Sequence, residues 1–354
     1  YTKVTGRRSF PKAWAKRAIE LERLANKALE KDRTVTASQF FHRAALCFGR
    51  AQHLVPIDGD PNKIGWYEGL RRCYDHLIAL SNSSIIGSSI EFEKGKETFF
   101  NFHRAEGDGA KPTILYIPGM DQVREDYPNP FKNEFTKRGM NICSMDGPGQ
   151  GECNMKSIWQ DETNYALAAE KVIDWLIQRE DVNSEKIGVF GTSMGSRWGV
   201  QVAAYDKRVK AVVGQMANVG TFDLIFEQAQ PNFKRIFMYM AGYTDEQLFD
   251  EFISRLALMP DLAKDVKVPH LLVAGDMDEL CTPKDIDVFR SALGGPSELW
   301  LYEGVFHPMG EVAEQIYPSI ADWLLTTLND GRPADCHNEI YIEENTVLAD
   351  YDHG

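Results

Sequence analysis

Ser193 lies in a setting that suits a nucleophile better than a structural serine. It stands in Gly191-Thr192-Ser193-Met194-Gly195, after the apolar run KIGVF and before a helical pattern that starts at Met194. A sharp turn from strand to helix lifts such a hydroxyl clear of both elements, and glycines two residues to either side let them pack closely. The alternative is a serine that only caps the helix. The strand and helix around this G-x-S-x-G pattern favour the nucleophile.

A serine nucleophile needs a general base, and His307 in EGVFHPMG follows the last predicted strand. The alternative is a loop histidine without a chemical role, but a base is needed at this position. We expect Pro308 in the first turn of the closing helix. The acid must accept a hydrogen bond from the histidine and fix its tautomer. We expect Asp278 in VAGDMDEL to be this acid, and Asp276 stays open as the alternative or as a turn cap.

An oxyanion formed at Ser193 would need two backbone N–H donors. Met194 supplies one of them, as the residue after the nucleophile. The loop after the predicted strand TILYIPG supplies the other, from Met120 or Gly119. Pro118 is excluded because proline has no N–H group.

These residues depend on a sheet whose strands end at one edge. Residues 10–80 carry apolar residues at helical spacing, and Thr36 or Ser38 is expected to cap the second helix. A hairpin is predicted around Lys94-Gly95-Lys96. From residue 113, apolar strands alternate with helices, which predicts a mostly parallel sheet covered on both faces. The strands are expected at 113–119, from 140, and at 186–191, 209–217, 270–275 and 297–304.

The same pattern predicts the domain organisation. We expect a helical N-terminal cap region over residues 1–83 and an α/β core over 84–330. Residues 218–268 interrupt the alternation with aromatic-rich, helix-like sequence, and we expect them to add to the cap. The acidic segment 331–354 lacks periodicity and is predicted to be a C-terminal extension outside the core.

Composition limits the partners of the chain. The 354 residues carry a net charge of −13, which disfavours nucleic acid because phosphate binding needs basic patches. The six cysteines form no CxxC pair and no zinc-ligand spacing, so we expect reduced thiols, a cytoplasmic location and no metal or organic cofactor. No apolar run of about 18 residues predicts a membrane span. A homodimer stays open, as does a removed segment before Tyr1.

At these residues the chain resembles the alpha/beta-hydrolase superfamily, over roughly residues 113–328 with the hairpin at 84–105. More narrowly, it resembles the branch of 2,6-dihydroxypseudooxynicotine hydrolase and the fungal heptaketide (yellowish-green) hydrolases. Three features carry this resemblance: FFHRAALCFGRA in the helical N-terminal region, MDGPGQGE at 145–152, and the long gap between Ser193 and Asp278. The chain has Ile117-Pro118-Gly119-Met120 where many esterases carry an HGGG-type loop, which argues against a lipase of that type.

The resemblance implies hydrolysis of a C–C bond beside a carbonyl through an acyl-enzyme, on a small aromatic or polyketide-like substrate of secondary metabolism. It also implies that helices cover the site and that an additional acid follows VVGQMA. Asp223 and Glu227 are the candidates, and both fit surface charges at least as well. Aromatic residues could enclose the substrate or simply form core: Phe40, Phe41, Trp66, Tyr67, Phe222 and Phe226. An esterase, lactonase or acyl transferase, or more distantly a non-catalytic binding protein, stays open.

Overall fold

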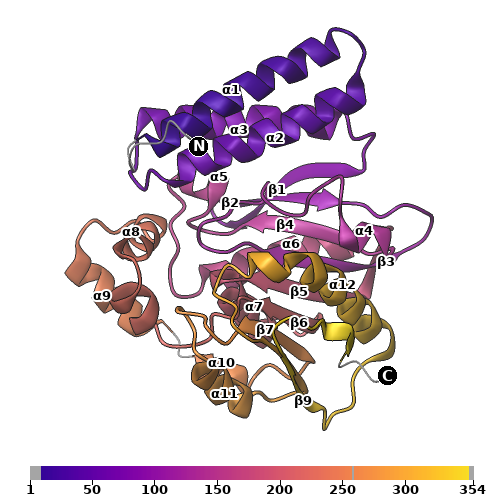
Figure 1. The fold of residues 1–354 in the computed structure, drawn as a ribbon, viewed down its shortest axis with the longest axis vertical. Helices are drawn as coiled ribbons and strands as arrows, with labels where there is room; N and C mark the ends of the chain where they lie inside the picture. Colours follow the sequence, from indigo (N-terminus) through magenta and orange to yellow (C-terminus); the bar gives the residue numbers. More distant parts are fainter. Residues whose placement is uncertain (1–8, 257–258, 351–354) are drawn as a thin grey trace.

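A nine-stranded sheet forms the centre of the molecule in the computed structural model, which describes residues 9–256 and 259–350 (Figure 1). The strands lie in the order β1-β2-β4-β3-β5-β6-β7-β8-β9. Their bounds are Ile85–Glu93 (β1), Lys96–His103 (β2), Lys111–Ile117 (β3), Asn141–Asp146 (β4), Val182–Thr192 (β5), Val209–Gln215 (β6), His270–Gly275 (β7), Ser297–Tyr302 (β8) and His337–Ile342 (β9).

Most neighbouring strands are parallel, as the alternation of strands and helices predicts. β1 and β2 form the predicted antiparallel hairpin, β2 is antiparallel to β4, and every other pair is parallel. Strands β4 and β7 are fully buried along their length, which explains their continuous apolar sequence. The α/β prediction and its mostly parallel, doubly covered sheet are therefore confirmed.

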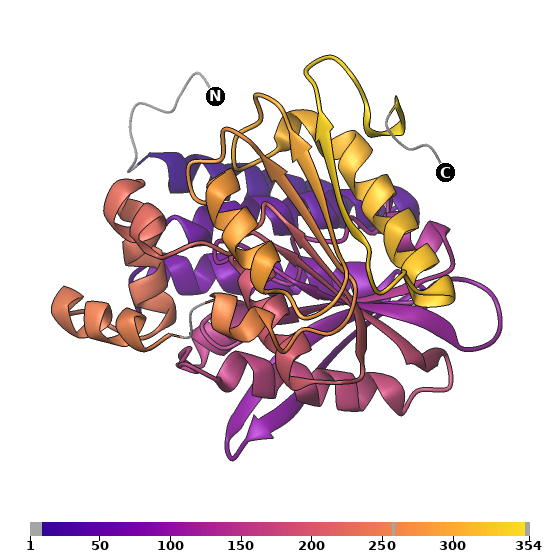
Figure 2. The same cartoon turned by 90° about the horizontal axis from the view of Figure 1, so that it is seen from below.

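Helices cover both faces of the sheet (Figure 2). One face packs against α6 (Asn164–Ile177), α7 (Met194–Tyr205) and α11 (Pro283–Ala292) in the largest apolar cluster. The other face packs against α4 (Glu134–Lys137) and α12 (Ala313–Asp330) in a second cluster. A short helix, α5 (Gly151–Met155), follows β4. This double cover keeps the sheet dry and leaves the strand ends as the place for polar groups.

Three N-terminal helices form a layer with its own apolar core above the β1 edge of the sheet (Figure 1). They are α1 (Phe10–Leu29), α2 (Thr34–His53) and α3 (Pro61–Ala79). The predicted cap of α2 is wrong, because the helix begins at Thr34 and its N-cap, Arg33, makes no side-chain capping bond. Ser38 lies inside the helix and donates to the carbonyl of Thr34 instead.

A helical insertion separates β6 from β7, as predicted for residues 218–268. It comprises a π-helical turn η1 (Leu224–Gln228), α8 (Pro231–Met240), α9 (Glu246–Arg255) and α10 (Met259–Ala263). Figure 1 shows α8 and α9 beside the sheet, on the side where α2 ends and α3 begins. Apolar residues of α8 and α9 join the cluster on the α7 face, so the insertion is packed onto the core.

The C-terminal segment corrects our prediction of an extension outside the core. Residues 337–342 form β9, which pairs in parallel with β8 along its whole length. A short 3₁₀ turn follows β9 at Leu348–Asp350, and another, at Gly310–Val312, directly precedes α12. The strand has an exposed outer edge and only Ile342 fully buried, which explains why its sequence shows no continuous apolar run.

Within the described ranges, no helix has the length and apolarity needed to cross a membrane. The six cysteines are free thiols, five of them buried. Over the same residues, no cluster of three or more His, Cys, Asp or Glu side chains is placed to hold a metal ion.

Candidate active site

Ser193 stands at the sharp turn between β5 and α7. Its backbone has φ 53° and ψ −124°, a conformation that residues other than glycine rarely adopt. Its amide N–H donates to the carbonyl of Gln215 on the neighbouring strand β6. The two flanking glycines allow this turn: a Cβ at Gly195 would collide with the carbonyls of Ile117 and Pro118, and one at Gly191 with the carbonyl of Gly195. The local sequence therefore presents the hydroxyl at the end of the sheet.

His307 meets this hydroxyl from the loop after β8. Its Nε2 lies 2.8 Å from Ser193 Oγ, and the residue is only 8% exposed. The predicted place of Pro308 is wrong, because α12 begins at Ala313 and a 3₁₀ turn comes before it. Met309, between Pro308 and the 3₁₀ turn, adopts a left-handed conformation, so the chain turns sharply after His307 before α12 starts.

Asp278, not Asp276, contacts the histidine. His307 Nδ1 lies 2.8 Å from Asp278 Oδ2 and 3.0 Å from Oδ1, and the amide of Leu280 donates to Oδ1. Asp276 accepts hydrogen bonds from the amide of Gly304 and from the hydroxyl of Tyr341, so its carboxylate holds the β7–β8–β9 edge. The structure thus brings together Ser193, His307 and Asp278 and assigns Asp276 to a separate turn.

The loop after β3 lies directly against Ser193. A Cβ on Gly119 would sit 3.3 Å from the Cβ of Ser193. The amide of Gly119 already donates to Gln122 Oε1, whereas among the described residues the amides of Met120 and Met194 have no protein acceptor. Met120 is therefore the better of the two candidates that the sequence left open in this loop.

Two glutamines that sequence reasoning missed hold this loop. Gln122 Oε1 accepts from Gly119 and from Thr192, the residue before the candidate nucleophile. Gln150 Nε2 donates to the carbonyl of Gly119, and its Oε1 accepts from Tyr165. The partners of Gln150 are 15 and 31 residues away along the chain, so only its place in the GPGQG turn could have drawn attention to it.

Two small cavities are each lined by one of the methionines Met120 and Met194, and Ser193 and His307 line neither of them. One is lined by Met120, Asp121, His53, Lys63 and Tyr239, so its walls come from the N-terminal helices, the loop after β3 and α8. The other is lined by residues of α7 and the insertion, with Met194, Arg197, Trp198, Phe222 and Phe237 among them. Burial lowers the pKa of Lys63 to about 7 and the pKa of Arg197 to about 10.

The two candidate auxiliary acids are not near this constellation. Asp223 is exposed before the π-helical turn. Glu227 is also exposed and forms an ion pair with Lys234 on α8, at 3.1 Å. Neither carboxylate lines the cavity at Met120 or the cavity at Met194, so the surface interpretation of both is the better one.

Most of the aromatic candidates form core. Phe40, Phe41 and Trp66 pack within the apolar core of the N-terminal helices. Phe222 stacks on Phe226 with ring centroids 5.2 Å apart, and only Phe222 of this pair lines the cavity next to Met194.

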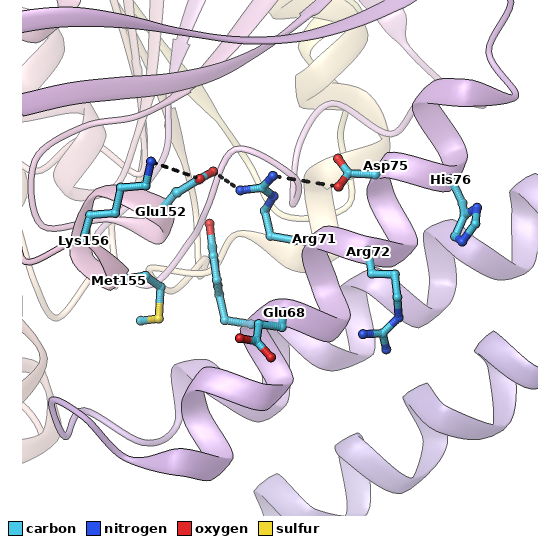
Figure 3. A pocket seen from close by; sticks show the side chains of 9 residues that line it. Glu68, Arg71, Arg72, Asp75, His76, Glu152, Met155 and Lys156 are labelled. Atoms are coloured by element: carbon cyan, nitrogen blue, oxygen red, sulfur yellow. Dashed lines mark ion pairs between the residues drawn. The ribbon is translucent and has the colours of Figure 1, made fainter.

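A larger, open pocket lies away from these residues, between α3 and α5 (Figure 3). Figure 3 shows Arg71 between Glu152 and Asp75, with Lys156 on the other side of Glu152. Glu152 also accepts from Arg124, at 2.9 Å. The ion pair of Arg71 with Glu152 joins the N-terminal helices to the core, and Ser193, Asp278 and His307 do not line this pocket.

Comparison with known proteins then places the chain. The model of the family described as "Esterase FrsA-like" matches residues 4–243. The chain belongs to the FrsA-like family. Together with the sheet and its connections, this membership places it in the alpha/beta-hydrolase superfamily, as the sequence resemblance suggested.

Curated relatives of this FrsA-like chain include a bacterial and a fungal hydrolase. It is 26% identical over 237 residues to 2,6-dihydropseudooxynicotine hydrolase of Paenarthrobacter nicotinovorans, covering 63% of the chain and 61% of the relative. It is 23% identical to alpha/beta hydrolase xenA of Xenoacremonium sinensis over 70% of the chain and 60% of the relative. The matched regions thus span less than two thirds of these relatives.

The fold likeness extends further along the chain. The crystal structure of 2,6-dihydroxy-pseudo-oxynicotine hydrolase superposes with a TM-score of 0.82, at 20% identity, over 92% of this chain and 90% of that one. AbyA5 superposes with a TM-score of 0.70 at 16% identity over the same shares. Both likenesses therefore include the N-terminal helices as well as the sheet.

Proposed function

We propose that this chain is a serine hydrolase in which Ser193 attacks a carbonyl carbon. The observation that carries the proposal is the unbroken hydrogen-bonded relay, with 2.8 Å from Ser193 Oγ to His307 Nε2 and 2.8 Å from His307 Nδ1 to Asp278. His307 takes the serine proton as general base, and Asp278 stabilises the imidazolium that forms. The strained backbone of Ser193 supports the same role because it aims the hydroxyl away from the turn.

The amides of Met194 and Met120 are the proposed donors to the tetrahedral oxyanion. Their lack of a protein acceptor among the described residues leaves both N–H groups available to a ligand. The two glutamines that fix the Gly119 loop keep the second donor in place before substrate arrives. Preorganised donors of this kind lower the barrier without reorganisation during the reaction.

For the bond that is broken, we propose a C–C bond next to a carbonyl, as in a β-diketone or an aromatic or polyketide ketone. After attack, the tetrahedral intermediate collapses, the C–C bond breaks and the electron pair leaves as an enolate or phenol-conjugated carbanion. The imidazolium of His307 protonates this leaving group, and water then hydrolyses the acyl-enzyme. The likeness to a relative named 2,6-dihydropseudooxynicotine hydrolase supports this choice. The N-terminal helices and the 218–268 insertion would act as the cap, since both contribute walls to the cavity beside Met120.

An ester or lactone hydrolase is the second candidate, and the description of the matching family as esterase-like favours it. An acyl transferase would use the same nucleophile, base and oxyanion donors. These reactions differ in the leaving group and in the acceptor of the acyl group, so products must separate them.

The proposal is tested by replacing the nucleophile and identifying the products. Ser193→Ala should abolish both turnover and labelling by a fluorophosphonate probe while the circular dichroism spectrum stays that of the parent chain. Full activity or undiminished labelling in this variant would rule out the mechanism and favour a binding protein. A side-by-side screen of aryl esters, lactones and 1,3-diketones, with mass spectrometry of the products, shows which bond the parent chain breaks.

A further inference from the structure

Arg197 is a buried cation without a carboxylate partner. It lies on α7, one helical turn after Ser193, and is 6% exposed. In the described part of the chain, its single hydrogen-bond acceptor is the carbonyl of Gly220, its Nε has no partner and no Asp or Glu forms an ion pair with it. The guanidinium stacks over the ring of Phe222, 4.1 Å from the centroid. Four of its five N–H donors therefore remain available.

The other deeply buried arginine of the site region shows what a structural guanidinium requires. Arg124 contacts three carboxylates: Glu125 at 3.0 Å, Asp146 at 2.7 Å and Glu152 at 2.9 Å. Such pairing offsets the cost of removing a charge from water. Arg197 has no such carboxylate partner. Burial lowers its pKa to about 10, so the side chain stays charged at neutral pH. A buried guanidinium without a carboxylate partner can form charge-assisted hydrogen bonds with an anionic group of a ligand.

The cavity at Arg197 has the size of a small anionic group. Its volume is about 30 Å³, which corresponds to roughly two water molecules. The other walls are largely apolar, including Trp198, Phe222 and Phe237. The one lining carboxylate, Glu162, lies 2.9 Å from the exposed Arg255 and is paired there. Met194, the residue after Ser193, also lines the cavity, whereas Ser193 and His307 do not.

We propose that Arg197 binds a carboxylate carried by the substrate, on the Met194 side of Ser193. This inference rests on the proposed hydrolase function and narrows the substrate to carbonyl compounds with a terminal carboxylate. The carboxylate replaces the water that an unpaired guanidinium would otherwise hold, and the aromatic walls strengthen the charge-assisted bonds by excluding solvent.

Turnover of matched esters tests the proposal. The substrates are 4-nitrophenyl half-esters of succinic, glutaric and adipic acid, each compared with the neutral 4-nitrophenyl ester of equal chain length. We expect the parent chain to hydrolyse the half-ester of one chain length with a higher kcat/KM than the neutral ester of the same length. Arg197→Gln should lower this ratio of the two kcat/KM values by about tenfold to a hundredfold. Arg197→Lys should recover part of the ratio, and Arg23→Gln on the exposed face of α1 controls for net charge.

A structural role for Arg197 predicts a different result. If the arginine only holds the Gly220 carbonyl, Arg197→Gln lowers kcat/KM for both esters equally and the ratio stays constant, which overturns the proposal. A parent chain that never prefers a half-ester overturns it as well.

Binding separates this proposal from the hydrolase mechanism. The Ser193→Ala chain should bind glutarate monoanilide, a carboxylate that cannot be turned over, and should bind the corresponding neutral amide at least about tenfold more weakly in calorimetry. Adding Arg197→Gln should abolish this preference. If the Ser193→Ala chain binds the carboxylate selectively but the parent chain turns over none of the esters, the proposed reaction is refuted and the carboxylate site is supported. If the parent chain turns over esters but neither chain prefers the carboxylate, the carboxylate site is refuted and the reaction is supported.

Discussion

At the scale of single residues, Asp278 decides which nitrogen of His307 carries the proton. An ionised carboxylate can only accept, so Nδ1, 2.8 Å from Asp278 Oδ2, must be the donor. In the neutral ring, Nε2 then carries the lone pair and accepts from Ser193 Oγ, 2.8 Å away. The amide of Leu280, which donates to Asp278 Oδ1, fixes the carboxylate in the orientation that this tautomer needs.

Asp278→Asn tests this argument. The amide can present its NH₂ group to Nδ1 and so favour the tautomer whose Nε2 carries the proton and cannot accept from serine. We expect kcat to fall by about 10³–10⁴-fold with little change in fold. The measurement is kcat for the best ester or diketone from the substrate screen.

Asp276→Asn is the matched control, because it makes the same chemical change two residues away. Asp276 contacts Gly304 and Tyr341 and not the histidine, so its kcat should stay within about tenfold of the parent value. Equal losses in both variants would contradict the assigned role of Asp278.

The sequence predicted that Ser193, His307 and Asp278 lie close together, because each follows a strand and the strand ends of a parallel sheet share an edge. It could not choose between Met120 and Gly119, since the choice depends on Gln122 bonding to the amide of Gly119. Nor could it place Glu227, whose pairing with Lys234 depends on how η1 packs on α8. Contacts of this kind come from tertiary packing, which periodicity does not encode.

At the scale of elements, the turn between β5 and α7 can form only if the backbone of α7 lies in contact with the end of β3. The absence of a side chain at Gly195 brings α7 against the carbonyls of Ile117 and Pro118, the last residues before the proposed oxyanion loop. The same glycine therefore links the turn of the proposed nucleophile to the loop that carries the second proposed oxyanion donor.

Gly195→Ala should destabilise the chain, because its Cβ would meet backbone carbonyls that no side-chain rotation can move away. We expect the free energy of unfolding to fall by about 3 kcal/mol, measured by urea denaturation. A change below about 0.5 kcal/mol would show that the close approach is not required.

Gly65→Ala makes the same substitution where space is open. Gly65 is exposed inside α3, and a Cβ there meets nothing within 4 Å. Alanine loses less backbone entropy in a helix, so the free energy of unfolding should rise by about 0.5–1 kcal/mol in the same denaturation experiment. A destabilised Gly65→Ala chain would refute this explanation.

Elements with strong periodicity were predictable, and those set by local geometry were not. The alternation after residue 113 gives the buried strands, since each passes through the dry centre of the sheet. β9 was missed because an edge strand with an exposed face needs few apolar residues. The start of α12 was missed because Pro308, which is compatible with a helix start, lies instead in a turn that Met309 closes with a left-handed backbone.

At the scale of the whole molecule, Lys63 lies where three parts of the structure meet. It stands on α3, its Nζ donates to Gln52 Oε1 of α2 at 2.8 Å, and it lies 4.7 Å from the ring centroid of Tyr239 on α8. The same cavity includes Met120 of the sheet loop. A charge placed there is removed from water by the N-terminal helices, the insertion and the core together.

Stability should therefore depend on pH through this lysine. Burial lowers the pKa of Lys63 from 10.5 to about 7 in the folded chain. Between about pH 7 and pH 10.5 the unfolded chain binds this proton and the folded chain does not, so the free energy of unfolding rises with pH, by at most about 1.4 kcal/mol per pH unit. Below pH 7 both states are protonated and the contribution is constant.

Lys63→Met removes this dependence and keeps an unbranched side chain that is one atom shorter. Denaturation at pH 7 and pH 9 should show the parent chain gaining about 2 kcal/mol relative to Lys63→Met between the two pH values. Lys12→Met, on the exposed face of α1, is the matched control and should follow the parent chain at both pH values. If the difference between the parent and Lys63→Met stays constant, Lys63 keeps its proton, and its bonds to Gln52 and the ring of Tyr239 outweigh the cost of burial.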